Sequence, residues 1–171
     1  MSLKLQIDNI IFSNYKKVKE WEVEDIRDKE NKKIYFETPY MYLPFGLEKD
    51  YKNYILKLQF KGVKNKSNKE MEDFYDIISY YENKIIEKKN INKDLFKSQI
   101  INKGNYDDML VIKINKKFFN INITNDIGDL KNIFQIEKKS EIKCKIHIDN
   151  IWGNNNIFTS KFILDEIIIK T

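Results

Sequence analysis

The longest helical pattern in this sequence is Ser67-Asn-Lys-Glu-Met-Glu-Asp-Phe-Tyr-Asp-Ile-Ile-Ser-Tyr-Tyr-Glu-Asn-Lys-Ile-Ile-Glu-Lys-Lys89. Ser67 and Glu70 have the spacing of a capping box. Apolar residues then recur at intervals of three or four, at Met71, Phe74, Ile78, Tyr81 and Ile85. We therefore predict a helix over residues 68–89, whose apolar stripe of about 100° should lie across a sheet.

Strands are predicted on the N-terminal side of this helix. Residues 54–60 alternate cleanly, with the even-numbered side chains on one face and those of Ile55, Lys57 and Gln59 on the other. Residues 34–38 form a short β-branched and aromatic run that Pro39 ends, and an aromatic loop follows at 40–46. Residues 3–12 also alternate, which predicts a first strand there, and the mostly polar residues 13–33 are expected to connect it to the next.

The C-terminal side of the helix is also predicted to be β-rich. A short helical turn is expected around Leu95 and Phe96, and residues 109–114 and 118–123 are expected to form a hairpin. Two long strands, 141–152 and 157–169, should pair across the glycine and asparagine turn at 153–156.

The predicted element order is β-β-β-α-β-β-β-β, within one domain over residues 1–171. We interpret the fold as mainly β (α+β), with one long helix inserted between the strands of a small β-barrel. This pattern resembles an OB-fold, in which a helix closes one end of a five-stranded barrel.

The composition indicates the cellular compartment of the protein more clearly than it indicates a binding partner. The net charge is +5 and the sequence pI is about 9.0, which suits an anionic partner. An AT-rich coding sequence would produce the same excess of Lys, Ile and Asn without any partner, so both interpretations remain open. One cysteine excludes an internal disulfide framework and favours a reducing compartment such as the cytoplasm. No apolar run approaches the ~20 residues of a membrane span, and residues 1–6 lack a signal-peptide pattern, so no membrane partner is predicted.

Catalytic and metal-binding patterns are not found in the sequence. The five glycines build no phosphate-binding loop, so no nucleotide cofactor is predicted. Neighbouring carboxylates at 107–108 and 165–166 should point to opposite faces of a strand, and so should Cys144 and His147. We therefore predict no catalytic residue and no metal site. Cys144 belongs to the core face, whereas His147 is either an exposed imidazole or part of a cationic surface with Lys143 and Lys145.

Aromatic residues make up 13% of the chain, and their positions divide them into two sets. The first set has inward positions and is expected in the core: Phe36, Tyr54, Phe60, Phe74 and Phe162. The second set occupies outward or loop positions and could contact a ligand: Tyr35, Tyr40, Tyr42, Phe45, Trp152 and Phe158. Rings beside lysines suit single-stranded nucleic acid, because every base offers a face for stacking worth ~1–3 kcal/mol.

Two blocks of the chain resemble a known family. The first is Ile34-Tyr-Phe-Glu-Thr-Pro-Tyr-Met-Tyr-Leu-Pro-Phe-Gly-Leu47, followed by the strand at 54–60. The second is Ile151-Trp152, an Asn/Gly turn, Phe158, Phe162 and a final apolar strand. Both are similar to blocks of the single-stranded-DNA-binding proteins of large cytoplasmic DNA viruses and related cytoplasmic linear plasmids. This chain departs from that pattern at Gly153 and Thr159, where an aromatic and a small residue are expected.

The resemblance implies an OB-fold-like protein that coats unpaired DNA during replication, without base specificity and without catalysis. In this hypothesis four lysines contact phosphates: Lys57, Lys143, Lys145 and Lys161. Five rings offer stacking surfaces for bases: Tyr35, Tyr40, Phe45, Trp152 and Phe158. Tyr42 is a further candidate contact, and His147 would contact either a phosphate or a base. Single-stranded DNA is the predicted partner, with replication proteins and a second copy of the chain as further candidates.

Two other functions are alternatives to single-stranded-DNA binding. One is a non-catalytic protein-interaction subunit of a virion or replication complex, and the other is a metal-dependent nuclease built from scattered carboxylates. Tryptophan fluorescence that is quenched by oligo(dT) would separate DNA binding from the interaction subunit, and Mg²⁺-dependent cleavage would indicate the nuclease.

Overall fold

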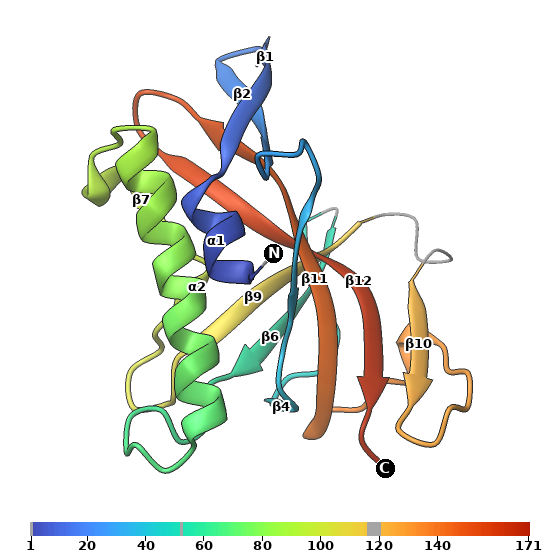
Figure 1. Cartoon of the computed structure of the whole chain (residues 1–171). Coiled ribbons are helices and arrows are strands. Elements are labelled where there is room, and N and C mark those ends of the chain that lie inside the picture. The colour runs from blue at the N-terminus through green and yellow to red at the C-terminus, as the bar shows by residue number, and fades with distance from the viewer. Residues whose placement is uncertain (1, 52, 116–120) are drawn as a thin grey trace.

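The computed structural model describes residues 2–51, 53–115 and 121–171 and is mainly β with one long helix (Figure 1). The helical elements are α1 (Leu3–Asp8), α2 (Lys69–Lys88) and the 3-10 turns η1 (Lys93–Leu95) and η3 (Ile133–Gln135). The strands are β1 (Ile11–Val18), β2 (Trp21–Arg27), β3 (Ile34–Glu37), β4 (Met41–Leu43), β5 (Glu48–Asp50), β6 (Asn53–Gln59), β7 (Phe96–Lys97), β8 (Ile100–Ile101), β9 (Met109–Ile114), β10 (Asn122–Asn125), β11 (Ser140–Gly153) and β12 (Phe158–Ile169).

The two C-terminal strands organise the sheet. Its order is β1-β2-β11-β4-β6-β9-β12-β10, and β11 also pairs directly with β12, antiparallel, over most of both strands. The pairings therefore lead from β11 through β4, β6, β9 and β12 back to β11. The inward side chains of these strands join one hydrophobic cluster with those of α2.

Helix α2 has the predicted apolar face. Met71, Phe74, Ile78, Tyr81 and Ile85 are all buried. The Tyr81 ring lies 5.7 Å from that of Phe36 and 5.6 Å from that of Phe162, so the helix covers the inner face of β3 and β12 (Figure 1). The Tyr81 hydroxyl also lies 2.7 Å from the Ser160 hydroxyl, which satisfies both buried groups.

The predicted strands at 34–38, 54–60, 141–152 and 157–169 are confirmed to within a few residues. Leu56, Leu58 and Phe60 are buried, as the alternation requires, whereas Ile55, Lys57 and Gln59 lie on the other face. In β11, Ile142, Cys144, Ile146 and Ile148 form the inward side. Period-two patterns therefore located the central strands correctly.

The predicted strand at 3–12 is wrong. Leu3–Asp8 forms helix α1, and β1 begins only at Ile11. The Ser2 side chain accepts a hydrogen bond from the Leu5 amide (3.2 Å), which caps the helix. Leu3 and Ile7 are four residues apart and both reach the core, Ile7 at 0% exposure. The same residues satisfy a period of two and a period of 3.6, and tertiary packing selects the helix.

Residues 13–33, which were expected to connect two strands, contain most of β1 and all of β2. β2 pairs with β1 to form a hairpin that projects beyond the rest of the sheet (Figure 1). β2 also pairs with the end of β11. These pairings bury Val23 and Ile26, at 1% and 0% exposure, although charged residues surround both in the sequence. The expected exposed turn at 28–33 is present, held by two hydrogen bonds from backbone amides to Asp28 Oδ1.

The predicted hairpin between 109–114 and 118–123 is also wrong where the structure describes it. β9 has the expected bounds, but β10 pairs in parallel with β12 instead of antiparallel with β9. β12 lies between the two strands in the sheet order. Residues 118–120 of the predicted second strand lie outside the described residues.

The N-terminal cap of α2 gives a direct test of this local structure. Asn68, and not Ser67, is the N-cap, since its Oδ1 accepts a hydrogen bond from the Met71 amide (3.2 Å). Asn68→Ala should therefore lower the free energy of unfolding by about 0.5–2 kcal/mol in urea denaturation. Ser67→Ala is the matched control and should cost less. A larger loss for Ser67→Ala would contradict this capping.

Candidate nucleic-acid interface

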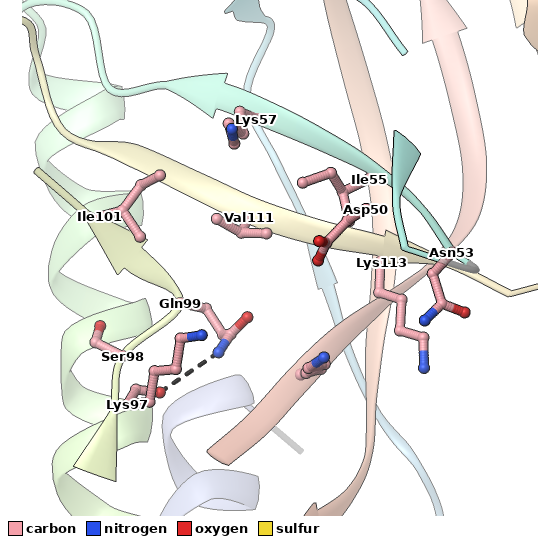
Figure 2. Close-up of a pocket in the computed structure, with 11 residues that line it drawn as sticks. Asp50, Asn53, Ile55, Lys57, Lys97, Ser98, Gln99, Ile101, Val111 and Lys113 are labelled. Atoms are coloured by element: carbon pink, nitrogen blue, oxygen red, sulfur yellow. Dashed lines mark hydrogen bonds between the residues drawn. The ribbon is translucent and has the colours of Figure 1, made fainter. Parts of the chain in front are cut away.

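A basic groove lies on the outward side of β6, β9 and β12 (Figure 2). It has a volume of about 260 Å³. Four lysines and one carboxylate are among the described residues that line it: Lys57, Lys97, Lys113, Lys161 and Asp50. In Figure 2, Val111 lies between Lys57 on one side and Lys97 on the other. We call this cavity the basic groove.

Strand alternation places three of these lysines on one surface. Lys57 alternates with the buried Leu56 and Leu58, and Lys113 alternates with the buried Ile112 and Ile114. Lys161 follows the buried Ser160 in β12. Lys57 is partly neutralised by Glu48, whose Oε1 lies 3.2 Å from its Nζ. The lysines of the groove still outnumber its acids, which favours an anionic ligand.

Register connects the basic groove to Tyr35. Lys113 in β9 is opposite Ile55 in β6 and Ile163 in β12. Ile163 is opposite His147 in β11, and His147 is opposite Tyr35 in β3. Cross-strand partners project from the same face of a sheet. These five residues therefore form one row across five strands, with the 45% exposed ring of Tyr35 at its end.

A bulge brings Trp152 to the same face. Between Ile148 and Ile151, β11 has two residues opposite the single residue Lys161 of β12. The extra residue shifts the alternation of β11 by one position, so the side chain of Trp152 points outward. Trp152 is then opposite Thr159, and Thr159 is opposite Lys97 in β7. Trp152 also meets Trp21 of the β1–β2 hairpin edge to face, with ring centroids 6.5 Å apart. Trp152 therefore flanks the basic groove on the side of Lys97.

His147 is buried, at 6% exposure, so the prediction of an exposed imidazole or a cationic surface group is wrong. Its Nδ1 lies 2.7 Å from Asp165 Oδ2, and the Tyr35 ring lies 5.8 Å away. Asp165 is an extra residue of β12, at a second bulge between Lys145 and Ile146 of β11. Sequence alternation predicted the face of His147 correctly, but not the ring and carboxylate that cover it.

The predicted residues Lys143 and Lys145 lie further along β11, among acids, and Tyr40, between β3 and β4, lies beside Lys143. Lys145 is opposite Glu37 and Glu166, and the same two carboxylates line a cavity of about 130 Å³ with Lys143 and Lys145. The Lys145 ammonium lies 4.9 Å from the Tyr35 ring centroid, and that of Lys143 lies 5.9 Å from the Tyr40 ring centroid. Charge is balanced on this part of the surface, so it is a weaker candidate for phosphate binding than the basic groove.

Tyr42 and Phe45 also contact lysines, although Tyr42 lies in strand β4 and not in the aromatic loop predicted at 40–46. The Lys61 ammonium lies 4.4 Å from the Tyr42 ring centroid, and that of Lys57 lies 5.8 Å from the centroid of Phe45. Phe45 is 40% exposed and meets the basic groove through Lys57. The structure therefore brings Lys57, Lys161, Phe45 and Trp152 to the groove or its margin, whereas Tyr35 lies further across the sheet, beyond β12 and β11.

Phe158 is half-buried, and its ring covers Gly153. The two residues are cross-strand partners, and a Cβ on Gly153 would lie 2.2 Å from Phe158 Cδ1. Gly153 is therefore required by the close approach of this ring.

Lys97 and Lys113 were missed in the sequence. Lys113 could have been found, because it alternates with buried isoleucines in a strand that was predicted correctly. Lys97 had no such signal, since its segment was expected to be a short turn. Its strand, β7, has two residues and exists only because it pairs with Phe158 and Thr159.

Metal binding, thiol chemistry and membrane crossing each depend on particular residues of the described part of the chain. No group of three or more His, Cys, Asp and Glu residues there could hold a metal ion. Burial raises the pKa of the Cys144 thiol far above its usual range, which makes it a poor nucleophile. No helix in the described ranges is long and apolar enough to cross a membrane. Ammonium groups in the groove and rings at its edges can instead neutralise phosphates and stack on bases.

Neither any family model nor any curated protein matches this sequence. Solved structures do match. The single-stranded-DNA-binding protein gp2.5 of bacteriophage T7 superposes with a TM-score of 0.52 and 13% identity, over 81% of this chain and 86% of that one. The fold is similar to that of a phage single-stranded-DNA-binding protein. A C-terminally truncated single-stranded-DNA-binding protein from bacteriophage Enc34 matches with a TM-score of 0.46 and 10% identity, over 95% of both chains. The gp2.5 likeness supports the OB-like fold predicted from the sequence.

Gly153→Ala tests the packing at this end of the interface. The new methyl group would meet the Phe158 ring, so the substitution should lower the free energy of unfolding by about 1–3 kcal/mol in chemical denaturation. In a Phe158→Ala background the methyl group has space, and Gly153→Ala should then cost much less. Equal costs in the two backgrounds would contradict the close approach of the ring.

Proposed function

We propose that this protein binds single-stranded DNA in the basic groove, without base specificity and without catalysis. The observation that carries the proposal is the convergence of Lys57, Lys97, Lys113 and Lys161 on one outward surface, with Tyr35 and Trp152 in register on the same face. The similarity of the fold to that of gp2.5 agrees with this ligand.

The proposed binding has two components with different physical behaviour. Lysines that neutralise phosphates release counterions, so this part of the affinity falls as salt rises and does not depend on sequence. Rings that stack on bases exclude water from both faces, and this part depends little on salt. A duplex keeps its bases stacked on each other, which leaves the rings without partners. Preference for single strands over duplex follows from the second component.

The biological setting is also a proposal. We infer that the strands β11, β4, β6, β9 and β12, which pair in succession and back to β11, form an OB-fold-like barrel. We also infer that the protein coats unpaired DNA during replication in the cytoplasm. The resemblance of residues 34–47 and 151–169 to proteins of large cytoplasmic DNA viruses and linear plasmids supports this setting. Binding of oligo(dT) that quenches tryptophan fluorescence is the primary test, since Trp152 flanks the groove. Equal affinity for duplex and single strand would count against the proposal, and absence of binding would favour a protein-interaction subunit.

The lysine component can be tested at Lys161, which is exposed in the basic groove. Lys161→Gln should weaken oligo(dT) binding and reduce the slope of log affinity against log salt by about 0.7, because one fewer phosphate is neutralised. Fluorescence anisotropy across a series of NaCl concentrations measures both effects. The control is Lys66→Gln, an exposed lysine in the turn before α2, which should leave the slope unchanged. Equal effects of the two substitutions would mean that the groove is not the binding site.

The ring component can be tested at Trp152. Trp152→Ala should weaken binding by ~1–3 kcal/mol and leave the salt slope unchanged, because stacking neutralises no phosphate. The matched control is Tyr106→Ala, which removes a ring that is 67% exposed and does not line the groove. A reduced slope, or an equal loss in the control, would contradict a stacking role for Trp152.

A further inference from the structure

One wall of the basic groove is a segment between two short strands. We call residues 96–101 the wall segment. Its first part, β7, pairs in parallel with β12 at Phe158–Thr159, and its last part, β8, pairs antiparallel with β9 at Met109–Leu110. The wall segment therefore spans from β12 to β9 at a place where those strands separate, since the described pairs between them are only Phe162 with Ile112 and Ile163 with Lys113.

This wall has open space on both sides. Lys97, Gln99 and Ile101 line the basic groove, and Ser98 lines both this groove and the cavity behind it. Phe96, Ser98 and Ile100 line a second cavity of about 320 Å³ on the opposite side, together with residues of α2. A segment with cavities on both faces gains less from apolar packing than a core strand does. Its position must depend more strongly on its polar contacts.

Glu82 of α2 makes those contacts. It is 6% exposed, and both of its carboxylate oxygens bond to the wall segment. The Gln99 amide donates to Oε2 (2.8 Å), and the Ser98 hydroxyl donates to Oε1. Ser98 Oγ in turn accepts from the Ile100 amide (3.0 Å). Burial raises the pKa of the Glu82 carboxyl, while the two hydrogen bonds oppose that shift.

The other contacts of Gln99 reach the groove strands. Its carbonyl accepts from the Val111 amide of β9 (2.9 Å), and its side-chain amide donates to Thr159 Oγ1 of β12 (3.1 Å). Thr159 is the residue between Lys97 and Trp152 in the cross-strand row. One carboxylate on the helix therefore connects, through Gln99, to both strands that flank the wall.

We propose that Glu82 is a positioning residue for the groove, which holds the wall segment so that Lys97 faces the bound strand. This inference rests on the proposed function of the groove. Glu82 lies behind the wall and does not line the groove itself. Its effect on binding is therefore expected to pass through Lys97 and not through Lys57, which belongs to β6.

The test is a double-mutant cycle on oligo(dT) affinity and its salt slope. In the wild type, Lys97→Gln should reduce the slope by about 0.7. Glu82→Ala should produce a similar loss by itself, and Lys97→Gln added to it should change little more, because the lysine is already displaced. Lys57→Gln should have its full effect in both backgrounds. If Lys97→Gln costs as much with Glu82→Ala as without it, the inference is overturned while the proposed function stands.

Tyr81→Phe is the matched control for a loss of stability. It removes the adjacent buried hydrogen bond of α2 to Ser160, and Tyr81 makes no hydrogen bond to the wall segment in the described structure. The effect of Lys97→Gln should remain undiminished in this background. If Tyr81→Phe suppresses it as Glu82→Ala does, then general destabilisation explains the result and the positioning role is overturned.

A measurement without DNA keeps the two proposals separable. Amide hydrogen exchange at Gln99 and Ile100 should become at least about tenfold faster in Glu82→Ala than in the wild type, since the Gln99 amide loses its acceptor. Tyr81→Phe should not produce this local change. Should Glu82→Ala fail to fold, Glu82→Gln and Ser98→Ala test the same contacts. Unchanged exchange overturns the positioning role, whether or not the protein binds DNA.

Discussion

The antiparallel pairing of β11 with β12 is the constraint on which the rest of the structure depends. β11 pairs with β2, β3, β4 and β12, and β12 pairs with β7, β9, β10 and β11. Most of the sheet is therefore attached to these two strands. A slip of one residue would move the buried face of Ile142, Cys144, Ile146 and Ile148 to the outside, so burial specifies the register strongly. The cross-strand rows that define the interface are consequences of that register.

Two bulges in the β11–β12 pairing change which side chains point toward the outer surface of the sheet. The bulge in β11 restores the outward direction at Trp152, beside Thr159 and Lys97. The bulge in β12 supplies Asp165, which pairs with the buried His147 under the ring of Tyr35. Bulges increase local twist and redirect side chains, and here one of them directs Trp152 outward beside the groove while the other directs Asp165 toward His147. Lysines are distributed along the whole chain, but the pairing of β9 with β12 and β6, and of β7 with β12, gathers four of them in a groove whose described lining has a single acid.

Sequence patterns predicted secondary structure best in segments that fit only one periodicity, either that of a helix or that of a strand. The stripe from Met71 to Ile85 and the alternation in 54–60 each fit one secondary structure, and both predictions are confirmed. The segment 3–12 fits both the helical and the strand periodicity. Its first half forms a helix because Leu3 and Ile7 then both contact the core. Strand β2 has a weak pattern because its apolar residues, Val23 and Ile26, become buried only through β1 and β11. Alternation predicts the outward face of Lys57, and Lys161 is a candidate site residue in the DNA-binding hypothesis, whereas Lys97 has no local signal.

The sequence by itself determined the mainly β class, the place and inward face of the long helix, and the sides of the central strands on which lysines and rings lie. It did so because helix and strand periodicity are local properties of the chain. Only the tertiary structure decided that Lys97 and Lys113 join Lys57 and Lys161, that Trp152 flanks the same groove, and that His147 is buried. Those outcomes depend on strand order, on bulges and on contacts between residues far apart in sequence, such as Glu82 with Gln99 and His147 with Asp165.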